Sequence, residues 1–212
     1  MENYLTIKKD GHFSQVIKKS EFICSIARVN SEEEAQQFIN QISPKNKKAR
    51  HNCFAYLIGN HDEIQRESDN GEPAGTAGVP ILNALKQNQL HNVCAVVTRY
   101  FGGIKLGTGG LIRAYNSTTA AAIREIGVVN RVVMQQASFN LSYADFEKAK
   151  YFLNQNQIQL QDVDYTDQVK LTLMLKHDQI KIFQKQLTNY LNFPITLELG
   201  GNTYQDIEVK SN

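Results

Sequence analysis

The stretch RYFGGIKLGTGGLIRAY, residues 99–115, decides the local fold of the first half of this 212-residue chain. The apolar run VCAVV at residues 93–97 precedes it and predicts a buried strand, and the pattern of residues 111–126 predicts a helix. The glycines therefore stand where a strand ends and a helix begins. Because the first turn of a helix has unpaired N–H groups and a partial positive charge, this junction suits an anion, above all a phosphate.

Charged side chains and glycines around this junction are the candidate phosphate contacts. Arg99 and Lys105 are expected to be loop charges, and Arg113 lies near the first turn of the helix. Thr108 is the expected N-cap, with Gly109 at a tight turn. The predicted contacts, which include a cationic run at residues 44–51, are Lys47, Lys48, Arg50, Arg99, Gly102, Gly103, Lys105, Gly107, Gly109 and Arg113. The structural alternative is that the glycines only provide positive φ angles or close packing.

Another glycine cluster, SDNGEPAGTAG at residues 68–78, is the first along the chain and precedes a predicted helix over residues 79–90. Its acids have two interpretations. They are turn and capping acids, or they orient Arg99 or His51 through charge-assisted hydrogen bonds and so shape the pocket. The residues expected to shape a pocket are His51, Asp69, Glu72 and Tyr100.

Strands and helices alternate through residues 1–130, which predicts an α/β domain. Ser31 and Glu34 form a capping box at the start of the first expected helix, whose apolar residues recur at helical spacing. Residues before Phe22 are interpreted as a polar leader. The expected strands cover residues 22–29, 53–58 and 93–97, and residues 63–67 are expected to form a strand or a turn.

The pattern restarts near Asn130 and predicts a second domain, residues 131–212, of the α+β class. Its order is βαββαβ, the ferredoxin-like pattern, with both helices on one face of an antiparallel sheet. The expected elements are a strand at residues 133–141, a helix at 143–153, a hairpin at 158–165 and 169–175, a helix at 180–190 and a strand at 195–199, with Ile207 and Val209 in a return strand. No catalytic constellation stands out in this domain.

Composition limits the class of protein. The net charge is +2, and residues 1–130 carry the positive excess, with 15 Lys and Arg against 12 Asp and Glu. No apolar run approaches the roughly 20 residues of a membrane span, and the first residues lack the apolar core of a signal peptide. Three cysteines without a CxxC pair suit a reducing compartment. We therefore expect a cytoplasmic protein with no membrane partner.

Two short patterns raise the alternative of a zinc site. His51 and Cys53 form HxC, and His91 and Cys94 form HxxC, but neither spacing is common in zinc fingers, and Cys94 begins an apolar strand. The core interpretation is therefore preferred. Cys53 also lacks a third group that would orient His51 as its base. We expect no metal, no cofactor and no catalytic residue.

Three segments together resemble the YigZ/IMPACT family: KKARHNCFAY at residues 47–56, SDNGEPAGTAGVPIL at 68–82 and VVTRYFGGIKLGTGGLIRAY at 96–115. The resemblance extends over residues 20–122. It implies an N-terminal domain of the ribosomal-protein type with a left-handed βαβ crossover, as in domain IV of elongation factor G. The tail would resemble domain V of that factor. The resemblance therefore implies binding to RNA or the ribosome and a role in modulating translation, with a translation-related protein as a further partner.

Two other functions stay open at this point. GHMP kinases share the left-handed crossover and hold phosphates on a glycine-rich loop, so a phosphate-handling enzyme is the alternative, with Asp69 or Glu72 holding magnesium. Against it, the chain has no GxxxxGK[ST] pattern, and Leu111, Ile112 and Arg113 replace a serine-rich helix start. The third hypothesis for the function is a protein-interaction module that uses the same loops. The sequence leaves the oligomeric state open.

Overall fold

The computed structural model describes residues 1–46 and 49–209, which divide into two compact units. The N-terminal unit contains Glu2–Arg131 together with residues 206–209, and the C-terminal unit contains Val132–Gln205 together with Met1. The chain passes from the first unit to the second within β7 (Val128–Leu141), so the predicted boundary after residue 130 falls inside this strand.

The N-terminal unit is built on a sheet with the strand order β2-β3-β6-β4-β5. Each hydrogen-bonded pair in it is antiparallel. The strands are β2 (Gly11–Ile17), β3 (Ser20–Arg28), β4 (His51–Ile58), β5 (Ile64–Ser68) and β6 (Val93–Tyr100). The predicted alternation of strands and helices is confirmed, with β6 as the central strand.

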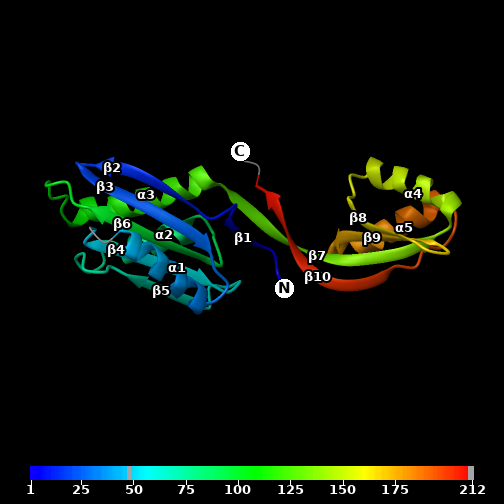
Figure 1. Ribbon diagram of the computed structural model, residues 1–212, viewed down its shortest axis with the longest axis horizontal. Helices are drawn as coiled ribbons and strands as arrows, with labels where there is room; N and C mark the ends of the chain where they lie inside the picture. The colour runs from blue at the N-terminus through cyan, green and yellow to red at the C-terminus, as the bar shows by residue number, and fades with distance from the viewer. Residues whose placement is uncertain (47–48, 210–212) are drawn as a thin grey trace. The chain divides into compact units, whose positions relative to one another are not determined.

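Helices cover both faces of this sheet (Figure 1). The helices α2 (Gly78–Gln87) and α3 (Thr108–Ile126) pack on one face, in a core with Val93, Ala95 and Val97 of β6. The helix α1 (Glu32–Lys45) packs on the other face, where Cys94 and Val96 of β6 contribute to a smaller core. Because both faces of β6 are buried, its sequence is an unbroken apolar run and does not alternate.

The first turn of α1 is capped as the sequence predicts, with one difference. The Ser31 hydroxyl accepts a hydrogen bond from the backbone N–H of Glu34, at 3.3 Å. The carboxylate of Glu34 accepts from the backbone N–H of Asn30, at 2.7 Å, and reaches one residue beyond the N-cap. Both contacts satisfy N–H groups that the start of a helix leaves without partners.

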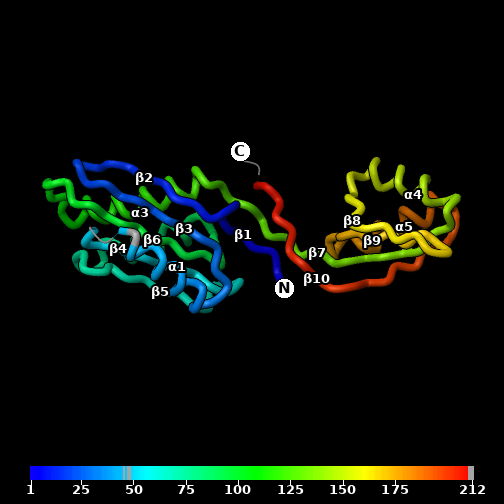
Figure 2. The backbone as a smooth tube through the Cα atoms, viewed as in Figure 1, coloured from blue at the N-terminus to red at the C-terminus, as the bar shows by residue number. Residues whose placement is uncertain are grey.

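The segment expected to be a polar leader is instead two strands. The strand β1 (Tyr4–Ile7) pairs with the first residues of β7, as Figure 2 traces, and β2 forms a hairpin with β3. The two-residue turn of this hairpin is Lys18 and Lys19, between the paired Ile17 and Ser20. Lysine pairs are not a turn signature, which explains why the sequence pattern missed the hairpin.

The C-terminal unit has the predicted order of elements. In its sheet, β7 pairs with β9 (Val169–Lys176), β9 pairs with β8 (Leu160–Tyr165), and β10 (Glu198–Glu208) also pairs with β7. The helices α4 (Tyr143–Gln155) and α5 (Ile180–Leu191) share one core with alternate residues of β9, so they cover the same face. The expected return strand at Ile207 is wrong, because β10 continues through this residue. Among the described residues, no helix has the length and apolar character needed to cross a membrane.

Two glycines of the 99–115 stretch have different packing. A Cβ on Gly102 would overlap the backbone carbonyl of Lys19, so this glycine allows the chain that leaves β6 to lie against the β2–β3 turn. A Cβ on Gly109 would meet Arg113 Nη1 at an ordinary 3.6 Å. The expectation of a tight turn at Gly109 is wrong, because this residue lies within the first turn of α3.

These environments predict opposite outcomes for two matched substitutions. Gly102→Ala should lower the free energy of unfolding by about 1–3 kcal/mol, because backbone must move to admit the methyl group. Gly109→Ala should change it by less than about 1 kcal/mol, since alanine favours the helix and meets no close neighbour. Urea unfolding of both variants tests this, and equal losses would contradict the packing described here.

Candidate nucleic-acid interface

Arg99 is a buried residue of β6 and not the exposed loop charge expected from the sequence. Its side chain is 7% exposed, and Nη1 donates a hydrogen bond to Glu72 Oε1 at 2.7 Å. The Glu72 side chain is only 3% exposed, so the two charges neutralise each other inside the N-terminal unit. The interpretation of Glu72 as an acid that orients Arg99 therefore agrees with the geometry.

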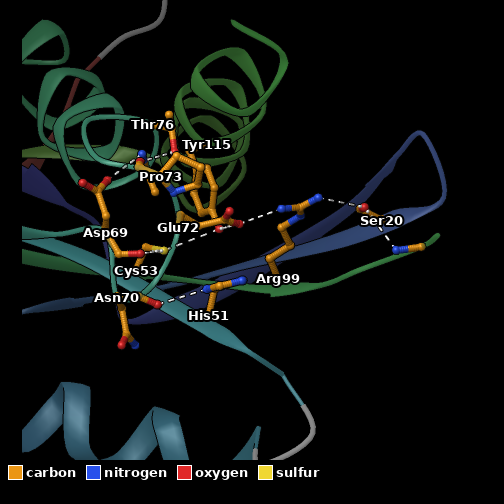
Figure 3. Close-up of polar contacts among 12 residues, drawn as sticks. Ser20, His51, Cys53, Asp69, Asn70, Glu72, Pro73, Thr76, Arg99 and Tyr115 are labelled. Atoms are coloured by element: carbon orange, nitrogen blue, oxygen red, sulfur yellow. Dashed lines mark hydrogen bonds and ion pairs between the residues drawn. The ribbon is translucent and has the colours of Figure 1, made fainter. Parts of the chain in front are cut away.

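Glu72 lies between Arg99 on one side and Tyr115 and Cys53 on the other (Figure 3). The Tyr115 hydroxyl donates to Glu72 Oε1 at 2.9 Å, and Cys53 Sγ donates to the carbonyl oxygen of Asp69 at 2.9 Å. Burial raises the pKa of the Cys53 thiol to about 12, and burial also raises the pKa of Tyr115 far above its ordinary value. Both groups are therefore neutral at physiological pH, and Cys53 acts as a hydrogen-bond donor.

The N-terminus of α2 already holds an anion from the chain itself. Asp69 accepts hydrogen bonds from the backbone N–H groups of Gly75, Ala77 and Gly78, at 2.7–2.9 Å. Burial alone would raise the pKa of Asp69, but these backbone donors together lower it from its ordinary value. The carboxylate stays ionised and occupies the anion-binding position at this helix start. In the first glycine cluster, the helix N–H groups are thus occupied by Asp69 of the same cluster.

The N-terminus of α3 is arranged differently. Its N-cap is Gly107, with a φ of 73°, and no described side chain caps it, so the prediction of Thr108 as N-cap is wrong. The first turn contains no acid. Gly103, with a φ of 83°, and Gly107 both use backbone conformations that favour glycine. The loop between β6 and α3 therefore leads into a helix start that keeps its N–H groups for another partner.

The exposed cations that the sequence predicted lie on this loop and beside it. Lys105 is exposed in the loop, and Arg113 is exposed on α3 with its guanidinium near Gly109. Arg50 is exposed immediately before β4, whose first residue, His51, is paired in register with Arg99. This register places Arg50 at the end of β6 where the loop begins. Lys47 and Lys48 lie outside the described residues.

Two further predicted residues brace the same end of the sheet. The Tyr100 hydroxyl donates to Asn46 Oδ1 at 2.9 Å, which ties the end of β6 to the residue that follows α1. His51 Nδ1 lies 3.1 Å from the carbonyl oxygen of Asn70, in the first glycine cluster. Both side chains therefore make contacts within the protein that fix the neighbouring loops.

Sequence reasoning missed the pair Lys18 and Lys19, which the β2–β3 hairpin brings to this end of the sheet. Both are exposed, and both have positive φ angles, 46° and 63°, where asparagine and glycine are favoured. They adjoin the loop because the N–H of Gly102 donates to Ser20 Oγ at 3.2 Å. No turn signature could have found them. We name Lys18, Lys19, Arg50, Lys105 and Arg113 the basic loop surface.

The pairs considered as zinc ligands are engaged elsewhere. Cys53 contacts the Asp69 carbonyl, and His91 Nδ1 lies 2.8 Å from Asp62 Oδ1. Within residues 1–46 and 49–209, no three His, Cys, Asp or Glu side chains are gathered as a metal ion would require.

The buried pair predicts a large effect of one substitution on stability. Glu72→Ala leaves the Arg99 guanidinium and the Tyr115 hydroxyl without their acceptor, so the free energy of unfolding should fall by about 3–5 kcal/mol. Glu72→Gln keeps an acceptor and should lose less. The control is Glu147→Ala, an exposed acid on α4, expected to stay within about 0.5 kcal/mol of the parent. A Glu72→Ala protein as stable as this control would contradict the role given to the pair.

Comparison with known proteins follows the division of the chain. Residues 18–123 match the model of the Impact N-terminal domain, and residues 139–192 match a domain of unknown function, DUF1949. The chain is 42% identical over 204 residues to the IMPACT family member YvyE of Bacillus subtilis (strain 168), an alignment that covers 96% of this chain and 94% of the relative.

Two more relatives agree. The IMPACT family member YigZ of Escherichia coli (strain K12) is 32% identical over 192 residues, covering 90% of this chain and 94% of the relative. A solved structure described as the crystal structure of an hypothetical protein superposes with a TM-score of 0.60 at 31% identity, covering 93% of this chain and 97% of that one. The resemblance noted in the three motifs is therefore confirmed, and the chain belongs to the IMPACT family.

Proposed function

We propose that this protein binds RNA, free or within the ribosome, through the basic loop surface, and that this binding modulates translation in the cytoplasm. The observation that carries the proposal is the contrast between two helix starts in one domain. The start of α2 is filled by Asp69, whereas the start of α3 has no acid in its first turn and lies beside Lys105 and Arg113. Such a helix start attracts phosphate.

The charges of the surface support an anionic partner. Arg99 is neutralised by Glu72 in the interior, so the positive charge outside this end of the sheet comes from the exposed cations, which outnumber the exposed acid Glu21. Three chain segments supply them: the β2–β3 turn, the residue before β4, and the loop that leads into α3. Cations spread over several loops suit a backbone of repeated phosphates better than a single small phosphate.

Family membership supports the connection with translation. The motifs resemble a family whose architecture is compared with domains IV and V of elongation factor G, and both of those domains work on the ribosome. A translation-related protein is accordingly the second expected partner. The alternative of a phosphate-handling enzyme gains no support, because Asp69 is held by backbone N–H groups and Glu72 by Arg99 and Tyr115. Both carboxylates are therefore engaged by groups of the protein itself.

The first test is the salt dependence of binding. The protein should co-sediment with ribosomal subunits or bind a structured RNA, and log affinity should fall linearly with log salt. Lys105→Ala/Arg113→Ala should weaken binding about tenfold at low salt, since two charged contacts are lost. It should also reduce the salt slope by about 1.4–1.8, the contribution of two phosphate contacts.

The matched control for this test is Lys181→Ala/Lys185→Ala, which removes two exposed lysines from α5 of the C-terminal unit. Its affinity and salt slope should equal those of the parent. Binding that is insensitive to salt, or equal losses in both double variants, would contradict the proposed surface.

The β2–β3 turn allows a second test, in which stability and binding move in opposite directions. Lys18→Asn/Lys19→Gly supplies the residues that positive φ angles favour, so it should raise the free energy of unfolding by about 1–2 kcal/mol. The same change removes two cations and should weaken RNA binding. Lys18→Gln/Lys19→Gln should weaken binding without the gain in stability. A stabilised variant that binds as tightly as the parent would show that the turn lies outside the interface.

A further inference from the structure

Phe101 is a large apolar side chain that the fold leaves in solvent. It is the first residue after β6, and the residue is 56% exposed. Ile104, in the same loop, is 41% exposed. Burial of a phenylalanine side chain is favourable, so an exposed one suggests a surface that another molecule covers.

The ring of Phe101 rests on the buried ion pair. The Arg99 guanidinium carbon lies 5.6 Å from the centroid of the Phe101 ring and 5.5 Å from that of the Phe22 ring, which is fully buried. The same guanidinium is bound to Glu72 and lies 3.5 Å from Ser20 Oγ. A cation held in place by other contacts thus supports one side of an otherwise exposed aromatic ring.

The surroundings of Phe101 are cationic. Its neighbour in the fold is the β2–β3 turn, because the register pairs Tyr100 with Glu21 and Gly102 contacts Ser20. Lys105 follows four residues later in the loop, and Glu21, paired with Tyr100, is an exposed acid nearby. A flat apolar ring among lysines matches the two parts of a nucleotide, a base with a π face and a phosphate with negative charge.

We propose that Phe101 is a stacking platform for an unpaired base, so that the RNA recognised by this surface is single-stranded or looped. The inference rests on the proposed function and names the form of RNA involved. In a continuous duplex each base face is covered by its neighbours, so a ring on the protein surface can stack only on a base that has left the helix. Phosphates on either side of that base would contact the lysines of the basic loop surface.

The experiment compares two substitutions with two RNA ligands. Phe101→Leu removes the aromatic face and keeps an apolar side chain, whereas Phe101→Tyr keeps the ring. The ligands are a ten-nucleotide single strand with 2-aminopurine at its centre and a blunt duplex of the same sequence. Parent and Phe101→Tyr should bind the single strand more tightly than the duplex and quench its 2-aminopurine fluorescence. Phe101→Leu should lose about five- to hundredfold in affinity for the single strand, together with the quenching, and keep its affinity for the duplex.

The outcomes separate this inference from the proposal on which it rests. If the parent binds RNA and depends on Lys105 and Arg113, but Phe101→Leu changes neither affinity nor quenching, the platform is wrong and the basic loop surface stands. If the parent binds neither RNA, both fail. If Phe101→Leu weakens only co-sedimentation with ribosomal subunits, the ring contacts a protein and the platform is wrong. Thermal unfolding of Phe101→Leu within about 2 °C of the parent verifies that the variant is folded.

Discussion

The pairing of Arg99 with Glu72 holds together the parts of the N-terminal unit that form the candidate site. Through it, the central strand β6 is joined to the first glycine cluster, to α3 by way of Tyr115, and to β3 by way of Ser20. Removing two charges from water is costly, and the contacts of Glu72 with Tyr115 and of Arg99 with Ser20 offset part of that cost. A buried pair of this kind favours one arrangement of the four segments, since few other arrangements give both charges a partner.

The two glycine clusters share one local feature, a glycine-rich loop before a helix, but their helix starts differ in what binds the N–H groups. Both lead into a helix start whose N–H groups suit an anion. In the first cluster the chain supplies its own carboxylate, Asp69, whose lowered pKa follows from the N–H groups around it. In the second, glycine itself is the N-cap. The difference comes from Asp69, whose carboxylate binds the N–H groups of residues six to nine positions later in the sequence. Composition alone does not reveal such a contact.

Much of the fold could be predicted because its signals are local. Apolar periodicity placed the helices, the unbroken run at residues 93–97 identified the buried central strand, and the βαββαβ order anticipated the C-terminal unit. The β2–β3 hairpin could not be predicted because its turn is formed by two lysines in conformations that lysine rarely adopts. Arg99 was misplaced for a related reason. Its burial depends on Glu72, which is 27 residues away in the sequence, and a local sequence pattern cannot identify a partner at that separation.

The three cysteines allow local opening of the N-terminal unit to be followed in time. Cys24, Cys53 and Cys94 are free and buried, and all three belong to strands of this unit. Burial raises the pKa of Cys24, like that of Cys53, to about 12, so the native protein presents almost no reactive thiolate. Alkylation must therefore wait for the sheet to separate. Its rate would report the opening of this sheet, without interference from the C-terminal unit, which contains no cysteine.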